Sequence, residues 1–394
     1  MVEWKKLGDV CSLKARIGWQ GLTQKEHKKT GDYLLVTGTD FKSNYQVDFD
    51  HCVYVDEIRY TQDPNIQLRP NDVLITKDGT LGKMAVIEDL PKPATLNGGL
   101  FVIRDTTGRI HHKFLLHYML SSKFQSIIES NHTNGTIKHL TQGLLTNFPF
   151  PIPSLQEQNR IVGILDTFTA SIENLKEQIT QRRKQFEHYR DQLLDFEGKE
   201  GIETKMLRDI AEIKVGPFGS LIHKNDYIKG GVPLVNPVQM QNGSIIKDES
   251  FSVSSEMAET LSSYLLRTND IVFARRGEIG RCAIVTEKES NYICGTGSLI
   301  VRFIEKVNSK YMLFMFCSPL CKKYLLKSAI GGSMLNINCD IVGKMIVPIP
   351  SLTEQSRIVS ILDTFEASIA NLEAQLSQRE KQYEYYRNKL LTFD

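Results

Sequence analysis

The chain has 394 residues, of which 41% are hydrophobic and 24% charged, and its formal net charge at pH 7 is +2. This length is sufficient for two or three domains. No run of about 18 apolar residues is present, which excludes a conventional membrane-spanning helix. The opening Met1-Val2-Glu3-Trp4 lacks the basic and apolar regions of a signal peptide, so we expect a cytoplasmic protein.

Residues 1–153 mix short apolar runs typical of strands with one helical pattern, which indicates an α+β domain. The predicted strands cover 33–36, 73–75 and 100–103, and one amphipathic helix is predicted over 113–130.

Two polar loops of this domain carry candidate DNA contacts. The first lies between predicted strands within 73–87, and the second covers 134–139. Lys and Arg suit guanine edges or phosphates, and acidic side chains can accept from cytosine N4. Alternatively, Gly79 and Gly82 only permit a turn and the charged side chains are solvated. The candidates are Lys77, Asp78, Thr80 and Lys83 in the first loop, and Asn134, Thr136 and Lys138 in the second.

Residues 154–197 form the first predicted long helix. Ser154-Leu155-Gln156-Glu157 is a capping box, which marks a helix N-terminus. Apolar residues then recur in steps of four and three, the 3.5-residue period of a coiled-coil seam. About 40 residues of helix give a rod of about 60 Å. The seam begins with Ile161, Leu165, Phe168, Ile172, Leu175 and Ile179.

Residues 198–347 match the first domain faintly, most clearly where 276–285 aligns on 78–87. We predict strands over 233–235, 271–273 and 299–301 and a helix over 310–328. Two units that share a fold but differ in their loops should present the same frame and read different targets. The candidate contacts are Arg275, Arg276, Glu278 and Arg281 in the first loop, and Ser333, Asn336 and Asn338 in the second.

The segment 348–393 repeats 151–196 without a gap, with 31 identities in 46 columns. If a pseudo-two-fold axis relates the halves, the two helices run antiparallel with the domains at opposite ends. Arg182 and Arg379 interrupt the seam at equivalent positions, where they either fix the register or contact another protein. The second seam begins with Ile358, Leu362, Phe365, Ile369, Leu372 and Leu376.

The charge is unevenly distributed along the chain. Residues 1–153 carry 18 basic and 16 acidic side chains, and 201–347 carry 18 and 14, whereas 154–200 and 348–394 are each net acidic. This distribution fits phosphate contact by the domains and protein contact by the helices.

Motifs of catalysis and of metal binding are missing. Asn236-Pro237-Val238-Gln239 lacks the second proline and the aromatic residue of an adenine methyltransferase motif, and 78–84 lacks two features of a phosphate-binding loop. Glu203-Thr204-Lys205 has nuclease-type spacing but no acidic partner on a nearby predicted strand. The seven cysteines include no CxxC pair, so we expect reduced thiols and no metal. Because no cofactor motif is present, we also expect no cofactor.

Several motifs carry a family resemblance. They are Pro-Ile-Pro-Ser-Leu-x-Glu-Gln-x-Arg-Ile-Val at 151–162 and 348–359, Ile-Leu-Asp-Thr-Phe at 164–168 and 361–365, Tyr-Arg-x-x-Leu-Leu at 189–194 and 386–391, and Gly-Thr-Leu-Gly-Lys at 79–83. With these motifs the chain resembles the specificity subunit of type I restriction-modification enzymes.

The resemblance implies two α/β target-recognition domains, 1–153 and 198–347, separated by two long antiparallel coiled-coil helices, 154–197 and 348–394. Such a subunit is not catalytic and reads an asymmetric bipartite site in double-stranded DNA, with the helices setting the spacing. The implied partners are two adenine methyltransferase subunits and two restriction-translocase subunits. S-adenosylmethionine, ATP and Mg would be bound only by those partners.

Two other classes stay open on the sequence. A self-sufficient DNA enzyme is disfavoured by the missing motifs. A coiled-coil scaffold that binds only proteins would leave the two diverged basic domains unexplained.

Overall fold

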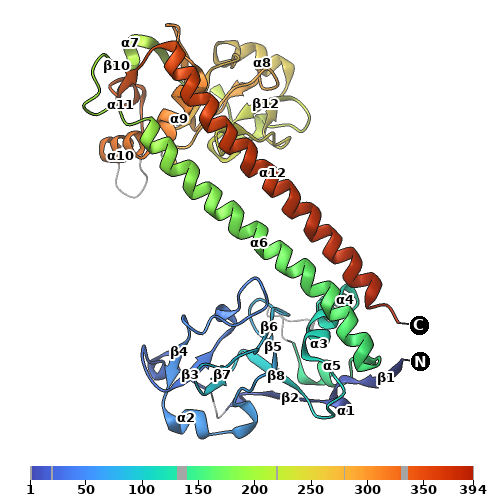
Figure 1. Ribbon diagram of the computed structural model, residues 1–394. Helices are drawn as coiled ribbons and strands as arrows, with labels where there is room; N and C mark the ends of the chain where they lie inside the picture. Colours follow the sequence, from blue (N-terminus) through green and yellow to red (C-terminus); the bar gives the residue numbers. More distant parts are fainter. Residues whose placement is uncertain are drawn as a thin grey trace. The chain divides into compact units, whose positions relative to one another are not determined.

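The computed structural model describes residues 2–18, 21–130, 140–218, 221–278, 280–329 and 336–393 (Figure 1). The chain divides into two compact units, one made of residues 1–179 with 371–394 and the other of 180–370. Each unit holds one globular domain and a part of both long helices, α6 (Leu155–Leu193) and α12 (Leu352–Leu390).

The N-terminal domain contains a four-stranded antiparallel sheet and a three-stranded mixed sheet. The first has the order β2-β8-β5-β6 and the second β4-β3-β7, in which β3 and β7 are parallel. A separate pair joins β1 (Glu3–Lys6) to β9 (Pro149–Ile152) just before α6. The remaining strands are β2 (Cys11–Ala15), β3 (Tyr33–Val36), β4 (Val53–Val55), β5 (Val73–Thr76), β6 (Met84–Val86), β7 (Ala94–Leu96) and β8 (Leu100–Asp105).

Short helices complete this domain. They are α1 (Leu7–Val10), η2 (Gln24–Glu26), η3 (Gly38–Asp40), α2 (Glu57–Thr61), η4 (Pro64–Ile66), α3 (His112–Met119), α4 (Ser122–Ser130) and α5 (Gln142–Thr146).

The second domain repeats this topology. Its four-stranded sheet has the order β11-β19-β16-β17, its three-stranded sheet β15-β12-β18, and β10 pairs with β20 before α12. A short hairpin of β13 and β14 is added. The strands are β10 (Glu203–Met206), β11 (Ala211–Val215), β12 (Val232–Val235), β13 (Met240–Gln241), β14 (Ser244–Ile245), β15 (Ser252–Val253), β16 (Ile271–Ala274), β17 (Cys282–Ile284), β18 (Ile293–Cys294), β19 (Ser298–Phe303) and β20 (Ile346–Ile349).

The short helices of the second domain follow the same order as in the first. They are α7 (Leu207–Ile210), η6 (Lys224–Asp226), η7 (Pro237–Gln239), α8 (Ser255–Thr260), η8 (Ser262–Tyr264), α9 (Ser309–Cys317), α10 (Pro319–Ser328) and α11 (Cys339–Gly343). The prediction of two mixed domains and two long helices is confirmed.

The predicted single helix near the end of each domain is wrong, because each segment forms two helices. In the second domain the break lies at Ser318, whose backbone is extended because Pro319 follows it. The Ser318 hydroxyl then caps α10 by accepting from the Cys321 N–H at 3.4 Å. In the first domain α3 ends before Ser121, whose hydroxyl donates back to the Tyr118 carbonyl at 2.6 Å.

Each long helix is 39 residues long and is fastened to the domain that precedes it. The Ser154 hydroxyl accepts from the Glu157 N–H at 3.3 Å, which is the serine half of the predicted capping box. Gln158 is buried one turn further on, where its side chain accepts from the His111 N–H at 2.8 Å and donates to the Pro153 carbonyl at 2.9 Å. Gln355 makes the equivalent contacts at the start of α12, so both helices leave their domains in the same way.

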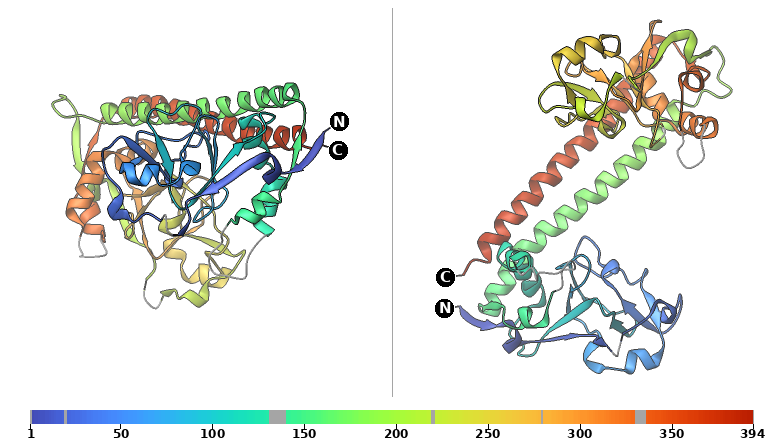
Figure 2. Two further views of the ribbon diagram at one scale, coloured as in Figure 1. Left: turned by 90° about the horizontal axis from the view of Figure 1, so that it is seen from below. Right: turned by 180° about the vertical axis from the view of Figure 1, so that it is seen from behind.

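Within each unit the two helices run antiparallel and enter the core of the domain. In the first unit the beginning of α6 packs with the end of α12, where Ile161 and Leu165 share one core with Tyr383 and Leu391 (Figure 2). Since burying each large apolar side chain contributes about 1.5–3 kcal/mol, the end of the chain stabilises the N-terminal domain. In the second unit Ile358 and Leu362 of α12 share a core with Leu194, which follows α6.

The predicted seam residues all lie at least partly inside the protein. Ile161, Leu165, Ile172, Leu175, Ile179, Ile358 and Leu362 are buried, and Phe168, Phe365, Ile369, Leu372 and Leu376 are half-buried.

Candidate nucleic-acid interface

The hairpin loop between β5 and β6 is held by a tight turn. Gly79 and Gly82 have φ values of 72° and 75°, a region that residues with a Cβ rarely adopt, so these glycines are required by the turn. The Thr76 hydroxyl accepts from the Lys83 N–H at 3.0 Å and donates to the Thr80 carbonyl. This arrangement leaves the predicted residues Asp78, Thr80 and Lys83 on the exposed surface of the loop.

Two backbone hydrogen bonds and one side-chain hydrogen bond bring three further segments to this hairpin. The Lys77 N–H donates to the Gly99 carbonyl at 2.9 Å, and the Lys77 carbonyl accepts from the Leu140 N–H at 3.0 Å. The Lys83 ammonium donates to the Gly38 carbonyl at 3.3 Å. We call the segments 37–40, 77–83 and 97–99 the N-terminal loop cluster.

The second domain repeats these contacts. The Arg275 N–H donates to the Gly297 carbonyl at 2.9 Å, and the Arg275 carbonyl accepts from the Ile337 N–H at 3.0 Å. Arg281 donates to the Pro237 carbonyl at 3.3 Å, as Lys83 does to Gly38. The segments 236–239, 275–278 with 280–281, 295–297 and 336–338 form the C-terminal loop cluster, built on the same frame.

The side chains on the two frames differ. In the C-terminal cluster Arg281 pairs with Glu278, and the Arg275 Nε donates to the Asn336 Oδ1 at 3.3 Å. The Asn338 Oδ1 caps α11 by accepting from the Ile341 N–H at 2.9 Å, so the structure gives Asn338 a role in the fold. Arg276 is exposed, and the corresponding position of the N-terminal cluster holds Asp78.

Four of the predicted contacts lie outside the described residues: Asn134, Thr136, Lys138 and Ser333.

Several residues of the two loop clusters were not predicted from the sequence. Apart from Asn97, which follows β7, the additional residues belong to a one-turn helix that follows β3 or β12, in which the Thr37 and Asn236 side chains accept hydrogen bonds from backbone N–H groups of their own turn. A polar residue that can cap a helix directly follows the equivalent strand in both domains, and this was the sequence signal that could have indicated these turns. The additional residues are Thr37, Thr39, Asn97, Asn236 and Val238.

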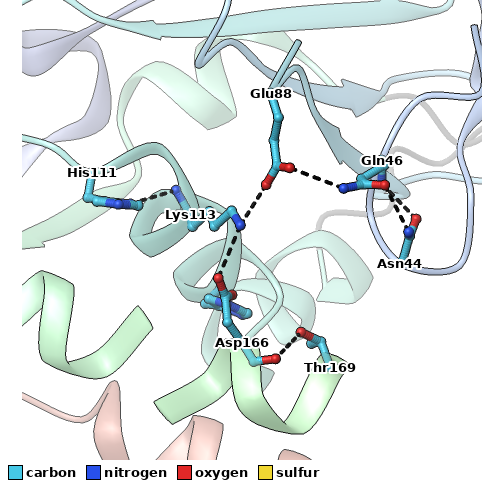
Figure 3. Close-up of polar contacts among 8 residues, drawn as sticks. Asn44, Gln46, Glu88, His111, Lys113, Asp166 and Thr169 are labelled. Atoms are coloured by element: carbon cyan, nitrogen blue, oxygen red, sulfur yellow. Dashed lines mark hydrogen bonds and ion pairs between the residues drawn. The ribbon is translucent and has the colours of Figure 1, made fainter. Parts of the chain in front are cut away.

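A polar network connects the N-terminal domain to the long helix of the same unit (Figure 3). The Lys113 ammonium lies 2.6 Å from the Glu88 carboxylate and 3.1 Å from that of Asp166 on α6. Glu88 also accepts from the Gln46 amide at 3.1 Å. The hairpin that carries the loop cluster is therefore linked to α6 through Glu88, which lies two residues after β6.

His117 continues this network into the core. Its Nε2 lies 2.9 Å from the Asp166 carboxylate and its Nδ1 lies 3.0 Å from the Tyr383 hydroxyl on α12. Burial lowers the pKa of His117, although the hydrogen bond with Asp166 opposes this shift. The neutral imidazole is thus the favoured form in the folded domain.

The two arginines that interrupt the seam each lie over an aromatic ring of the facing helix. The Arg379 guanidinium is 5.7 Å from the centre of the Phe168 ring, which stacks on Tyr386 at 5.3 Å. In the second unit Arg182 lies 5.8 Å from the Phe365 ring, which stacks on Tyr189 at 5.3 Å. These contacts support the interpretation that the arginines fix the register of the helix pair.

Among the described residues no group of three or more His, Cys, Asp or Glu side chains could hold a metal ion. Within the same ranges, no helix combines the length and the apolar character that a membrane span needs. Lys205 of the nuclease-like tripeptide pairs with Glu305 and Glu203 at the surface, an ordinary ion-pair arrangement.

Two domains with equivalent loop frames, each joined to a long helix, define a duplicated recognition subunit. The family described as type I restriction modification DNA specificity domain matches residues 1–182 and again 199–380. The chain therefore belongs to the type I restriction-modification specificity family, and it is a specificity subunit without catalysis of its own.

Its relatives carry the same description. The chain is 30% identical over 408 residues to an Escherichia coli type I restriction enzyme specificity subunit (EcoR124I/EcoR124II), with 100% of this chain and 94% of the relative covered. It is 29% identical over 302 residues to a putative type I specificity subunit of Haemophilus influenzae, covering 72% of this chain and 73% of the relative.

Solved structures share the fold. The S subunit of a type I restriction-modification system from M. genitalium matches 100% of this chain and 97% of its own length, with a TM-score of 0.56 at 16% identity. A chain from a structure of type I complex assembly and conformational transition matches 99% of this chain and 96% of its own length, with a TM-score of 0.63 at 17% identity.

Proposed function

We propose that this specificity subunit reads a bipartite site in double-stranded DNA, and that each loop cluster reads one half-site. The observation that carries the proposal is the repeated frame with different side chains. Lys77 and Arg275 make the same two backbone contacts in their domains, yet the next residue is Asp78 in one and Arg276 in the other. An arginine suits guanine, whereas a carboxylate can accept only from a donor such as cytosine N4.

The helices set the distance between the half-sites in this proposal. Support comes from the way each helix is fixed at its start by a buried glutamine and along its length by an arginine–aromatic stack. A spacer that is fixed in register transmits a constant separation, whereas a loosely packed pair of helices would not.

The chemistry belongs to partner subunits. We propose that two methyltransferase subunits and two restriction-translocase subunits assemble on this chain in the cytoplasm, and that they alone bind S-adenosylmethionine, ATP and Mg. The family membership supports this division of labour. Calorimetry of the isolated chain with S-adenosylmethionine should give no binding heat until a methyltransferase subunit is added.

Domain exchange tests the proposed function. Replacing residues 1–153 by the corresponding domain of another family member, in cells that express the complete system, should change one half of the methylated sequence. Single-molecule sequencing of the methylated genome reads both halves at once. Retention of both original halves, or a change in both, would contradict the assignment of one half-site to each domain.

A further inference from the structure

Two thiols meet beside the hairpin of the second domain. Cys282 is the first residue of β17 and is buried, whereas Cys317 is the last residue of α9 and is half-buried. Their Sγ atoms are 3.6 Å apart. Since a disulfide needs a sulfur–sulfur distance of about 2.05 Å, the two sulfur atoms have to approach by about 1.5 Å to be joined.

The surroundings of this pair favour attack by Cys317. The hydrogen bond with Cys282 lowers the pKa of the Cys317 thiol; burial and the Glu366 carboxylate oppose this shift, whereas the nearby Lys322 and Arg190 side chains support it. The thiolate is the form of cysteine that reacts with oxidants. By contrast, burial raises the pKa of the Cys11 thiol to about 12, so that cysteine stays protonated and unreactive.

We propose that Cys317 and Cys282 form a reversible oxidation site whose oxidant is a peroxide. In the first step the Cys317 thiolate attacks one peroxide oxygen, an S–O bond forms and the O–O bond breaks, which leaves Cys317 as a sulfenic acid. The other peroxide oxygen departs as an alkoxide or hydroxide and takes up a proton. In the second step the Cys282 sulfur attacks the sulfenic sulfur, the S–O bond breaks, and its proton departs with the hydroxyl as water. Two electrons pass from the thiol pair to the peroxide, and a dithiol or glutathione returns them.

The site would act on one domain only. Cys282 directly follows Arg281, so a disulfide would tie the end of the hairpin loop to α9. The same loop also packs against the next helix, α10, because a Cβ placed on Gly280 would lie 3.2 Å from the Cγ atom of Lys322. In the N-terminal domain the equivalent positions hold Met84 and Leu120, neither of which can be oxidised to a disulfide.

The experiment uses the purified full-length chain, with hydrogen peroxide as the probe. After brief exposure, N-ethylmaleimide labels the remaining thiols, and tryptic peptides are read by mass spectrometry. We expect the number of free thiols to fall from seven to five. The peptide that follows Arg281 should become linked to the peptide that ends at Lys322, and dithiothreitol should restore both.

Matched variants assign the linkage, because the peptide ending at Lys322 also contains Cys321. Cys317→Ser should abolish the linked peptide, whereas Cys321→Ser should retain it. Hydrogen exchange then reports the consequence: oxidation should slow exchange across 271–285 and leave 73–87 unchanged. Seven free thiols after oxidation, a linkage that survives Cys317→Ser, or unchanged exchange at 271–285 would each overturn the proposal.

Discussion

The same helix–domain junction is polar in one unit and apolar in the other. In the first unit His117 and Tyr383 meet with ring centres 6.1 Å apart, and in the second the equivalent Phe314 and Phe186 meet at the same 6.1 Å. The duplicated frame therefore preserves the geometry of the contact while its chemistry changes. This difference shows that the frame tolerates both a polar and an apolar ring pair at the same junction.

The largest expected effect on stability comes from replacing a buried leucine that occurs at equivalent positions in the two units. Leu165 and Leu362 are equivalent residues, and each is fully buried in the core of its unit. Leu165→Ala or Leu362→Ala should cost about 2–5 kcal/mol, because each leaves a cavity in a packed core. Hydrogen exchange should show the loss in the unit that carries the change. Gln178→Ala, at an exposed position of α6, the helix that carries Leu165, is the control and should leave both units unaffected.

A smaller effect should separate the polar junction from the apolar one. Tyr383→Phe leaves the His117 Nδ1 without its partner and should cost about 1–3 kcal/mol in the first unit. Adding His117→Phe recreates the pair found in the second unit and should recover most of the loss. A double variant that is less stable than Tyr383→Phe would show that the junction does not tolerate the exchange.

The polar junction should also make the first unit sensitive to acid. The folded state lowers the pKa of His117, so the unfolded chain binds more protons and stability falls as the pH drops below about 6.5. His117→Phe should reduce this dependence, measured as the unfolding midpoint of the first unit between pH 5 and pH 8. An unchanged slope would assign the effect to other groups.

The smallest effect concerns the arginines that lie over aromatic rings. Arg379→Ala should cost about 0.5–2 kcal/mol in the first unit, and Arg182→Ala should cost the same in the second, because each removes a cation–π contact. The charge-preserving changes Arg379→Lys and Arg182→Lys should lose less. Equal losses for alanine and lysine would show that guanidinium shape, and not charge, makes the contact.

Periodic features of the sequence predicted much of the fold. The doubled segment predicted two long helices with the correct seam, and short apolar runs located six strands, among them β3 and β16. The breaks between α3 and α4 and between α9 and α10 were not predicted, because the helical pattern of apolar residues continues across them. Pro319 was the local signal for one of these breaks.

The candidate site was predicted less completely, since it is assembled from distant segments. The strand–loop–strand pattern located the hairpin loops. It did not predict the turns at 37–40 and 236–239, each of which accepts a hydrogen bond from the hairpin through one backbone carbonyl. The His117–Tyr383 contact joins residues 266 positions apart, and no local pattern reports such a pair.

The most direct test of the central claim compares one residue from each loop cluster. Asp78→Ala and Arg276→Ala change equivalent positions on the two frames, and both variants are expressed with the complete restriction-modification system. Single-molecule sequencing of the methylated genome should show Asp78→Ala relaxing one base of one half-site and Arg276→Ala relaxing one base of the other, at a cost of about 1–3 kcal/mol each. Unchanged half-sites in both variants, or relaxation of the same half-site by both, would contradict the claim that each cluster reads its own half.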